Sequence, residues 1–318
     1  MKIGIIGGAG YTAGELLRIL LRHPQVEIGF VHSNSNAHKP IYEVHQDLIG
    51  ETELLFTNEI SQAVDVIFLC VGHGEAIRFL EKHTLGSHIK VIDLSQDHRL
   101  GQLDWVYGLP ELNKPAIQQA RLIANPGCFA TCIELALLPL AKEHLLNDEI
   151  HISGTTGSTG AGQKPTETTH FSWRNNNLSV YKAFEHQHLA EIMQSIRQLQ
   201  PNFSHEINFI PYRGNFTRGI LASVYLNFAG TIEQAKEMYQ SYYENEPFVV
   251  LSSMNPDLKQ VINTNKCILY LEKHKNKLLI ISLIDNLTKG ASGQAVQNMN
   301  LIFGLEETTG LLLKPSAF

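Results

Sequence analysis

The residue with the clearest chemical potential in the chain is Cys128, which follows an Asn-Pro-Gly segment and precedes an apolar run that predicts a helix over 132–140. A helix N-terminus carries partial positive charge and free N–H groups, and both stabilise a thiolate, the nucleophilic form of cysteine. Many cysteines are instead small buried hydrophobic residues, and Cys70, Cys132 and Cys267 fit that description better. The sequence therefore predicts Cys128 as a nucleophile.

The spacing of Cys128 and Cys132, one helical turn apart, is the only hint of a metal site. Structural zinc sites usually use a C-x2-C pair together with a second Cys or His pair, and no second pair follows at a suitable distance. The sequence therefore predicts no metal.

A glycine-rich loop separates a strand-like run at 2–6 from a helix-like run at 14–22. Such a loop turns backbone N–H groups and a helix N-terminus toward a pyrophosphate. Its spacing, Gly-x-x-Gly-x-x-Ala, is a variant of the dinucleotide fingerprint. Glycine turns often serve packing alone, but the position directly after the first strand favours cofactor binding. The predicted cofactor residues here are Gly7, Gly10, Tyr11, Thr12 and Ala13.

The end of the second predicted strand, at 26–32, indicates which dinucleotide is bound. An NAD enzyme places Asp or Glu there to accept hydrogen bonds from the ribose. This chain has Ser33 and Asn34 instead, with Lys39 further on, and its Glu27 lies at the wrong end of the strand. Hydroxyl, amide and ammonium groups suit a 2′-phosphate, so the sequence favours NADP.

The elements that position these residues alternate between strand and helix through the first third of the chain. Further strands are predicted at 64–71, 90–94 and 121–124, and this alternation is typical of a parallel sheet. After about residue 148 the pattern changes: a helix is predicted near 186–199, and β-rich segments at 206–228 and 266–285. The final helix, 292–304, is amphipathic and is expected to pack on the first domain.

The predicted fold class is therefore α/β, with a Rossmann-type parallel-sheet cofactor domain and an α+β catalytic and oligomerisation domain. The predicted domains are 1–127 with 292–318, and 128–291.

Composition excludes several classes of protein. The chain has 318 residues, 43% hydrophobic and 18% charged, with a net charge of −6. These values are typical of a globular protein, and without a basic surplus a nucleic-acid partner is not expected. No apolar stretch approaches the roughly 20 residues that cross a bilayer, and the start is not a signal peptide. We expect a cytoplasmic protein with no membrane partner.

Beyond these two motifs, longer blocks of the sequence resemble the N-acetyl-gamma-glutamyl-phosphate reductase family, the arginine-biosynthesis relatives of aspartate-semialdehyde dehydrogenase. The resemblance runs nearly end to end. It is most specific in ANPGC and DNLTKGASGQAVQNMN, and extends to GGAGYTAGELLRILLRHP, VIDLSQDHRL, YGLPELN, GSTGAGQKP, the HQH at 186–188 and TRGI at 217–220.

The resemblance implies that Cys128 attacks a gamma-acyl phosphate, expels phosphate and forms a thioester, which NADPH reduces to the semialdehyde. Covalent catalysis of this kind divides one difficult reduction into two easier steps. The substrate is a small anionic acyl phosphate, which requires cationic partners. The resemblance points to Arg99, Arg218, His186, His188 and Arg213 for the substrate, and to Gly160, Ala161, Gly162, Asn286 and Lys289 for the cofactor. For each arginine a structural ion pair is the alternative, and the two histidines serve equally well to cap and pack.

One departure from the family pattern concerns the general acid/base. The family has a Pro-His pair six residues before its Arg-Gly, and counting back from Arg218 places Tyr212 at the position of that His. A tyrosine with its usual pKa of about 10 is a poor base at neutral pH. Tyr212, a shifted His186 or His188, and water all remain open as substitutes. The change also allows a different acyl group, for example succinyl, recognised by Arg213.

Three other interpretations remain. The same chemistry could act on aspartyl phosphate or an aminoadipate-type acyl phosphate, and a phosphate-using aldehyde dehydrogenase could run it oxidatively. A non-catalytic NADP-binding regulator is the alternative of a different class. The family is oligomeric, so a homo-oligomer, a dimer or a tetramer, is also expected.

Overall fold

The computed structural model describes residues 1–101 and 104–316, and these divide into two compact units. The first comprises Met1–Pro126 and Ala291–Leu312, and the second comprises Gly127–Gly290 with the chain from Leu313 onward. The chain passes from one unit to the other after Pro126 and after Gly290, each one residue before the predicted domain boundary. The segment after Leu312 differs from the prediction, because it groups with the second unit.

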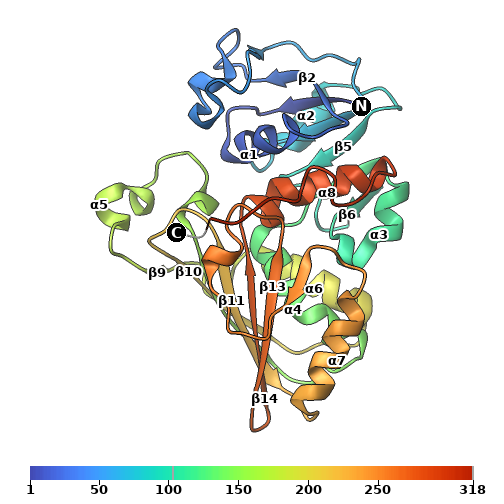
Figure 1. The fold of residues 1–318 in the computed structure, drawn as a ribbon, viewed down its shortest axis with the longest axis vertical. Coiled ribbons are helices and arrows are strands. Elements are labelled where there is room, and N and C mark those ends of the chain that lie inside the picture. Colours follow the sequence, from blue (N-terminus) through green and yellow to red (C-terminus); the bar gives the residue numbers. More distant parts are fainter. Residues whose placement is uncertain (102–103, 317–318) are drawn as a thin grey trace. The chain divides into compact units, whose positions relative to one another are not determined.

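The first unit is built on a parallel sheet of seven strands in the order β3-β2-β1-β4-β5-β7-β6 (Figure 1). The strand order reverses between β1 and β4, and in open α/β sheets a ligand binds where the order reverses, beyond the carboxyl ends of the strands. Its elements are β1 (Lys2–Ile6), α1 (Tyr11–Leu20), β2 (Glu27–His32), η1 (Ile41–Glu43), η2 (Gln46–Leu48), β3 (Phe56–Thr57), β4 (Val66–Leu69), α2 (Glu75–Lys82), β5 (Lys90–Asp93), β6 (Trp105–Tyr107), α3 (Pro110–Gln119), β7 (Leu122–Ala124) and α8 (Gly293–Ile302).

Several elements of this unit were not predicted individually: the short turns η1 and η2, the strands β3 and β6, and the helices α2 and α3. Helix α3 begins with Pro110, a favourable first residue, but contains Pro115 and a non-helical kink at Asn113, which hide its periodicity. Strand β6 has only three residues. Helix α8, which was predicted, packs against α1, α3 and β5 within this unit.

The second unit contains a mixed seven-stranded sheet in the order β12-β13-β14-β11-β8-β10-β9. The predicted fold class, a parallel-sheet domain followed by an α+β domain, is confirmed. The elements of the second unit are α4 (Cys128–Lys142), β8 (Ile150–Thr156), η3 (Ser158–Ala161), η4 (Glu167–Thr169), α5 (Phe171–Arg174), β9 (Ser179–Val180), α6 (His188–Leu199), β10 (Ile207–Arg213), β11 (Ile220–Asn227), α7 (Ile232–Tyr243), β12 (Val249–Leu251), η5 (Leu258–Gln260), β13 (Cys267–His274), β14 (Lys277–Ile284) and the π-helical turn η6 (Thr288–Ser292).

Helix α4 packs on one face of this sheet, against β11, β13 and β14, and α6 and α7 pack beside it. The helix is buried around its whole circumference, and its apolar composition, with a single acid (Glu134), accounts for this. Tyr239 and Tyr243 of α7 donate their hydroxyls to the α4 carbonyls of Ala136 and Leu135. The N-terminus of α4 is therefore held in place by a packed core.

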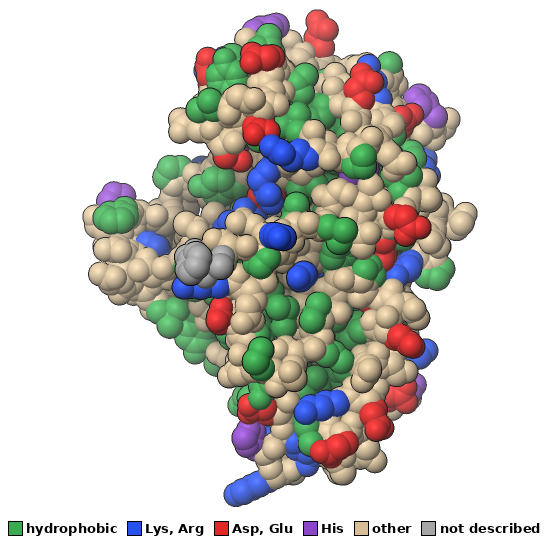
Figure 2. Space-filling model, in the orientation of Figure 1, with side chains coloured by type: hydrophobic (Ala, Val, Ile, Leu, Met, Phe, Trp, Pro, Cys, Tyr) green, Lys and Arg blue, Asp and Glu red, His purple; other side chains and the backbone are tan. Residues whose placement is uncertain are grey.

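Acidic and basic side chains are interspersed across the face drawn in Figure 2. Among residues 1–101 and 104–316, no helix is both long and apolar enough to span a membrane. The same residues include no group of three or more His, Cys, Asp or Glu side chains that could hold a metal ion.

Candidate active site

Cys128 is the first residue of α4, and Gly127 before it is the extended N-cap. The side chain is partly exposed, in contrast to the fully buried Cys132 one turn later. Gly290 lies directly against it, because a Cβ at Gly290 would fall 2.7 Å from the Cys128 Cβ. The helix N-terminus favours the thiolate, so the position suits a nucleophile.

Two residues of α6 contact the residue that precedes this cysteine. The Gly127 N–H donates to Oε2 of Glu191 at 2.9 Å, a bond between residues 64 apart in sequence. The His188 ring packs over Gly127, where an added Cβ would lie 2.4 Å from Nε2. His188 Nε2 is also 3.9 Å from Glu191 Oε1. The carboxylate thus holds both the N-cap of α4 and an imidazole beside the cysteine.

His186 is the imidazole next to His188, with ring centroids 4.6 Å apart. Burial, together with the nearby charges of His188 and Lys182, lowers its pKa to about 3. Its Nδ1 accepts the backbone N–H of His188 at 3.2 Å. A histidine that is neutral throughout the physiological range cannot serve as a general acid there. His186 therefore supports His188, and of the two only His188 remains for proton transfer.

Tyr181 and Arg213 adjoin these histidines, and the Tyr181 ring contacts that of His186 at a centroid distance of 5.8 Å. The Arg213 guanidinium lies over the Tyr181 ring, 4.6 Å from its centroid. Burial raises the pKa of Tyr181 to about 12, with a contribution from the charge of Cys128, so the phenol stays protonated. The Arg213 Nε is buried without a hydrogen-bond partner. Among the described residues no carboxylate pairs with Arg213, so its charge is not neutralised by an acidic partner there.

Tyr212 is on the other face of the sheet, so its prediction as the acid/base is wrong in geometry. Side chains alternate along a strand. On β10, Phe209 contacts the rings of Phe129 and His186, and Arg213 contacts Tyr181. Tyr212 falls between them in alternation and is paired with the half-exposed Val180. It therefore points away from Cys128.

Two of the predicted substrate arginines form hydrogen bonds with other groups of the protein. Arg218 donates from Nε to Asp285 at 2.9 Å and from Nη2 to Thr288 at 3.0 Å. Arg99 is 6% exposed and donates to the carbonyls of Asn125 and Leu94. Both arginines brace loops, so the structural alternative accounts for their positions.

The predicted cofactor residues of the second unit fall into two groups, one buried and one at least partly exposed. Asn286 is buried, accepts from the Gly219 N–H at 2.7 Å and donates to Thr159, so it ties together two loops. Lys289 is fully buried beside the Phe248 ring and is closed to a cofactor, which corrects its assignment. Gly160, Ala161 and Gly162 are partly or fully exposed on and after η3, and Gly162 has a positive φ of 77°.

The dinucleotide loop in the first unit has the geometry that a pyrophosphate needs. Gly7 has a φ of +78°, and a Cβ there would strike the Cys70 carbonyl at 2.5 Å. A Cβ at Gly10 would meet nothing closer than 3.9 Å, so the space at the start of α1 is open. Thr12 accepts a hydrogen bond from Ser292 at its carbonyl, which fixes the first turn. Tyr11 is 41% exposed and Ala13 is fully buried, so Ala13 serves helix packing.

A cavity of about 560 Å³ lies beside this loop, and Ser33 and Asn34 line it as predicted for an adenosine ribose. The loop, the open start of α1 and the cavity at the end of β2 fit a dinucleotide. Lys39 does not line the cavity. The lining comprises Ile6, Gly7, Ala9, His32, Ser33, Asn34, Ser35, Asn58, Ile60, Val71, Glu75, Arg78, Phe79, Lys82 and His83.

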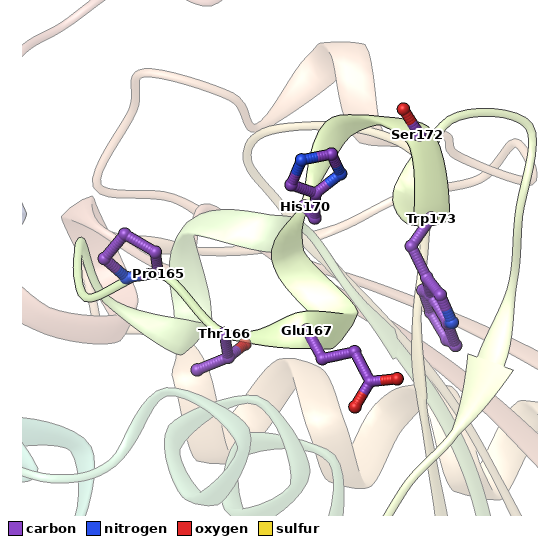
Figure 3. A pocket seen from close by; sticks show the side chains of 6 residues that line it. All are labelled: Pro165, Thr166, Glu167, His170, Ser172 and Trp173. Atoms are coloured by element: carbon purple, nitrogen blue, oxygen red, sulfur yellow. The ribbon is translucent and has the colours of Figure 1, made fainter.

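Another cavity, of about 600 Å³, lies around η4 and α5 (Figure 3). Pro165, Thr166, Glu167, His170, Ser172 and Trp173 line it. None of these is a predicted site residue, and the lining offers neither a cysteine nor an arginine. We assign it no part in the reaction.

Sequence reasoning missed Glu191, Tyr181 and the α2 cations Arg78 and Lys82. The three-residue spacing of His188 and Glu191 on a predicted helix was a usable signal for the first. No local pattern marks Tyr181, because its neighbours come from distant segments.

Comparison with known families gives two matches that together cover most of the chain. Residues 2–120 match the semialdehyde dehydrogenase NAD-binding domain, and residues 128–286 match the semialdehyde dehydrogenase dimerisation domain. Among full-length relatives, N-acetyl-gamma-glutamyl-phosphate reductases of Parabacteroides distasonis, Flavobacterium johnsoniae and Azobacteroides pseudotrichonymphae are 58%, 59% and 60% identical, each over 100% of both chains.

Solved structures share the fold at low sequence identity. Aspartate semialdehyde dehydrogenase II of Vibrio cholerae, complexed with ASA, has a TM-score of 0.77 at 19% identity, covering 95% of this chain and 98% of that one. The aspartate semialdehyde dehydrogenase of Candida albicans with NADP has a TM-score of 0.72 at 14% identity, with the same coverage.

Proposed function

The chain belongs to the semialdehyde dehydrogenase family, among its N-acetyl-gamma-glutamyl-phosphate reductases, and from that membership we propose that it reduces N-acetyl-gamma-glutamyl phosphate to N-acetylglutamate 5-semialdehyde. Its place is then in arginine biosynthesis. The observation that carries the proposal is the partly exposed Cys128 at the N-terminus of α4.

The Cys128 thiolate attacks the acyl carbon, the carbon–oxygen bond to phosphate breaks, and inorganic phosphate leaves with the electron pair. The product of this step is a thioester on Sγ. A nicotinamide cofactor, when bound, would supply the hydride that reduces the thioester carbon. The resulting thiohemiacetal collapses to the aldehyde, and its sulfur leaves as the thiolate.

We assign the proton transfers to His188. The thiohemiacetal oxygen must gain a proton as hydride arrives and lose it as the C–S bond breaks, and one imidazole beside the sulfur can do both. Glu191 orients this imidazole and stabilises its cationic form. The protonated Tyr181 hydroxyl provides a second donor near the reacting carbonyl.

Arg213 is the proposed anion-binding residue of the substrate subsite. It is the cation of this cluster that has no acidic partner among the described residues, and a guanidinium fork matches the geometry of a phosphate or carboxylate. The aromatic face of Tyr181 fixes its position.

The test of the function is a spectrophotometric assay in the reverse direction with semialdehyde, inorganic phosphate and NADP. Reduction of NADP that depends on phosphate and on N-acetylglutamate semialdehyde supports the proposal. Turnover of only aspartate or aminoadipate semialdehyde would show that the enzyme acts on a different acyl phosphate. Absence of activity with every semialdehyde would favour the alternative of a non-catalytic NADP-binding regulator.

Replacing Arg213 with Ala is expected to raise the KM for the acyl phosphate about 10- to 100-fold, because a charge-assisted bond of roughly 2 kcal/mol is lost. The measurement is forward kinetics with N-acetyl and N-succinyl substrates, and Arg197→Ala on α6 is the control. If the variant lowers kcat alone and binds both substrates normally, Arg213 is not the anion site. Equal preference for the two acyl groups in wild type and variant would end the hypothesis that Arg213 selects the acyl group.

We propose NADP as the cofactor, since no carboxylate follows β2 within residues 33–39 and the cavity there carries basic side chains. None of the four cysteines is in a disulfide, which is usual in a reducing compartment and supports the cytoplasmic location.

We also propose that the chain is a homo-oligomer that pairs through the sheet face of the second unit opposite α4. The matched family is a dimerisation domain, and apolar side chains on this face are exposed or only partly buried. They are Val180, Ile210, Tyr212, Tyr225 and Leu279.

Leu279→Lys is expected to dissociate the assembly, because it places a charge in the middle of this face. Light scattering after size exclusion measures the mass, and Lys236→Ala on α7 is the control. An unchanged oligomer in the Leu279 variant would contradict this interface.

A further inference from the structure

Helix α2 presents two cations to the cavity beside the dinucleotide loop. Its residues at spacings of three and four form one helical face, and that face lines the same cavity as Ser33 and Asn34. The members of this face are Glu75, Arg78, Phe79 and Lys82.

The charge of this cavity favours an anion. Arg78 and Lys82 are exposed, and no ion pair joins either to a carboxylate among the described residues. The acid of the lining, Glu75, already accepts the Gly72 N–H at 3.1 Å. An anion bound in this cavity would pair with the Arg78 and Lys82 cations.

The position of the cavity identifies the anion. In this fold the ribose of the adenosine lies at the carboxyl end of β2, which is where Ser33 and Asn34 line the cavity. NADP differs from NAD by one phosphate group, which is carried by this ribose. Ser33 is 7% exposed and offers a hydroxyl, but the loop from 33 to 39 contributes no arginine. The planar guanidinium that suits a phosphate comes from α2 instead.

We propose that Arg78, with Lys82 beside it, binds the 2′-phosphate of NADP and sets the choice between NADP and NAD. This inference rests on the NADP dependence proposed above. Lys39, which the sequence offered for the role, lies outside the cavity lining.

The test measures binding of adenosine 2′,5′-bisphosphate and adenosine 5′-monophosphate to the full chain by calorimetry, together with KM values for NADP and NAD. Arg78→Gln is expected to weaken the bisphosphate and raise the KM for NADP about 10- to 100-fold. Binding of the monophosphate and kcat with saturating NADP should stay within about twofold of wild type. Lys82→Gln should act in the same direction with a smaller effect, and Arg22→Gln, on the surface of the same unit, is the control.

The outcomes separate this inference from the one on which it rests. A wild type that binds both nucleotides equally would overturn NADP dependence itself. A wild type that prefers the bisphosphate while Arg78→Gln and Lys82→Gln retain that preference would overturn only the role of α2. If only Lys39→Gln weakened binding of the bisphosphate, the 2′-phosphate would be bound by the loop after β2 and not by α2.

Discussion

Replacing the Cys128 sulfur with oxygen is expected to lower kcat about 1,000-fold or more, equivalent to about 4 kcal/mol of transition-state stabilisation. A serine hydroxyl at a helix N-terminus is not ionised at neutral pH, so the first covalent step loses its nucleophile. Forward kinetics of Cys128→Ser with the acyl phosphate and NADPH measure the effect. KM for NADPH should stay near that of wild type, because the dinucleotide loop is unchanged.

Cys132→Ala is the matched control on the same helix. The Cys132 thiol is fully buried and contacts Ser282 at 3.3 Å, so its loss should reduce stability by about 1 kcal/mol and leave kcat nearly unchanged. Undiminished turnover in Cys128→Ser would show that the covalent scheme is wrong. A large loss of kcat in Cys132→Ala would show that the helix, rather than the sulfur, controls the rate.

His188→Asn is expected to lower kcat by about 100- to 10,000-fold, the usual range for loss of a general acid/base. Asparagine can still hydrogen-bond but cannot carry the proton. The kcat of wild type should depend on pH through the ionisation of His188, and that dependence should vanish in the variant. A pH–rate profile of both proteins, measured at saturating substrate, is the required experiment.

Tyr212→Phe is the control for this assignment. Its side chain points to the sheet face opposite His188, so kcat should remain within about twofold of wild type. Glu191→Gln should lower kcat and shift the pH profile, because the carboxylate positions His188. If Tyr212→Phe abolishes the pH dependence and His188→Asn preserves it, the proton is carried by the tyrosine.

The local parts of the site were predictable because each is encoded in a short segment. The loop from Gly7 to Ala13 follows a strand and opens a helix, and Cys128 begins a helix, as their neighbours in sequence indicate. Ser33 and Asn34 line the cavity after β2 for the same reason. In each case a few consecutive residues determine both the backbone and the side-chain direction.

The contacts between distant segments were not predictable in this way. Counting from Arg218 reached Tyr212, but the alternation along β10 decides which side chain faces the cysteine, and a step of one residue reverses the face. Arg213 therefore faces Tyr181, and the family motif alone could not show this. Glu191 reaches Gly127 across 64 residues, a pairing set by the packing of α6 on α4.

Burial, or hydrogen bonds to buried groups, explains the other differences from the predicted roles. Arg99, Arg218 and Lys289 carry charges that a sequence presents as available for ligands. In the structure Arg99 and Arg218 meet carbonyl and carboxylate oxygens, and Lys289 is closed off from solvent. A buried charge requires such partners, and a single sequence does not reveal which charges will be buried.

The most direct test of the account is the mass of the enzyme after it is mixed with N-acetyl-gamma-glutamyl phosphate in the absence of NADPH. We expect an increase equal to the mass of the substrate minus that of the displaced phosphate, which is one N-acetylglutamyl group in place of the thiol hydrogen. It should be located on the peptide containing Cys128 and be removed when NADPH is added. An unmodified protein under conditions where turnover with NADPH is fast, or an acyl group on any other residue, would contradict it.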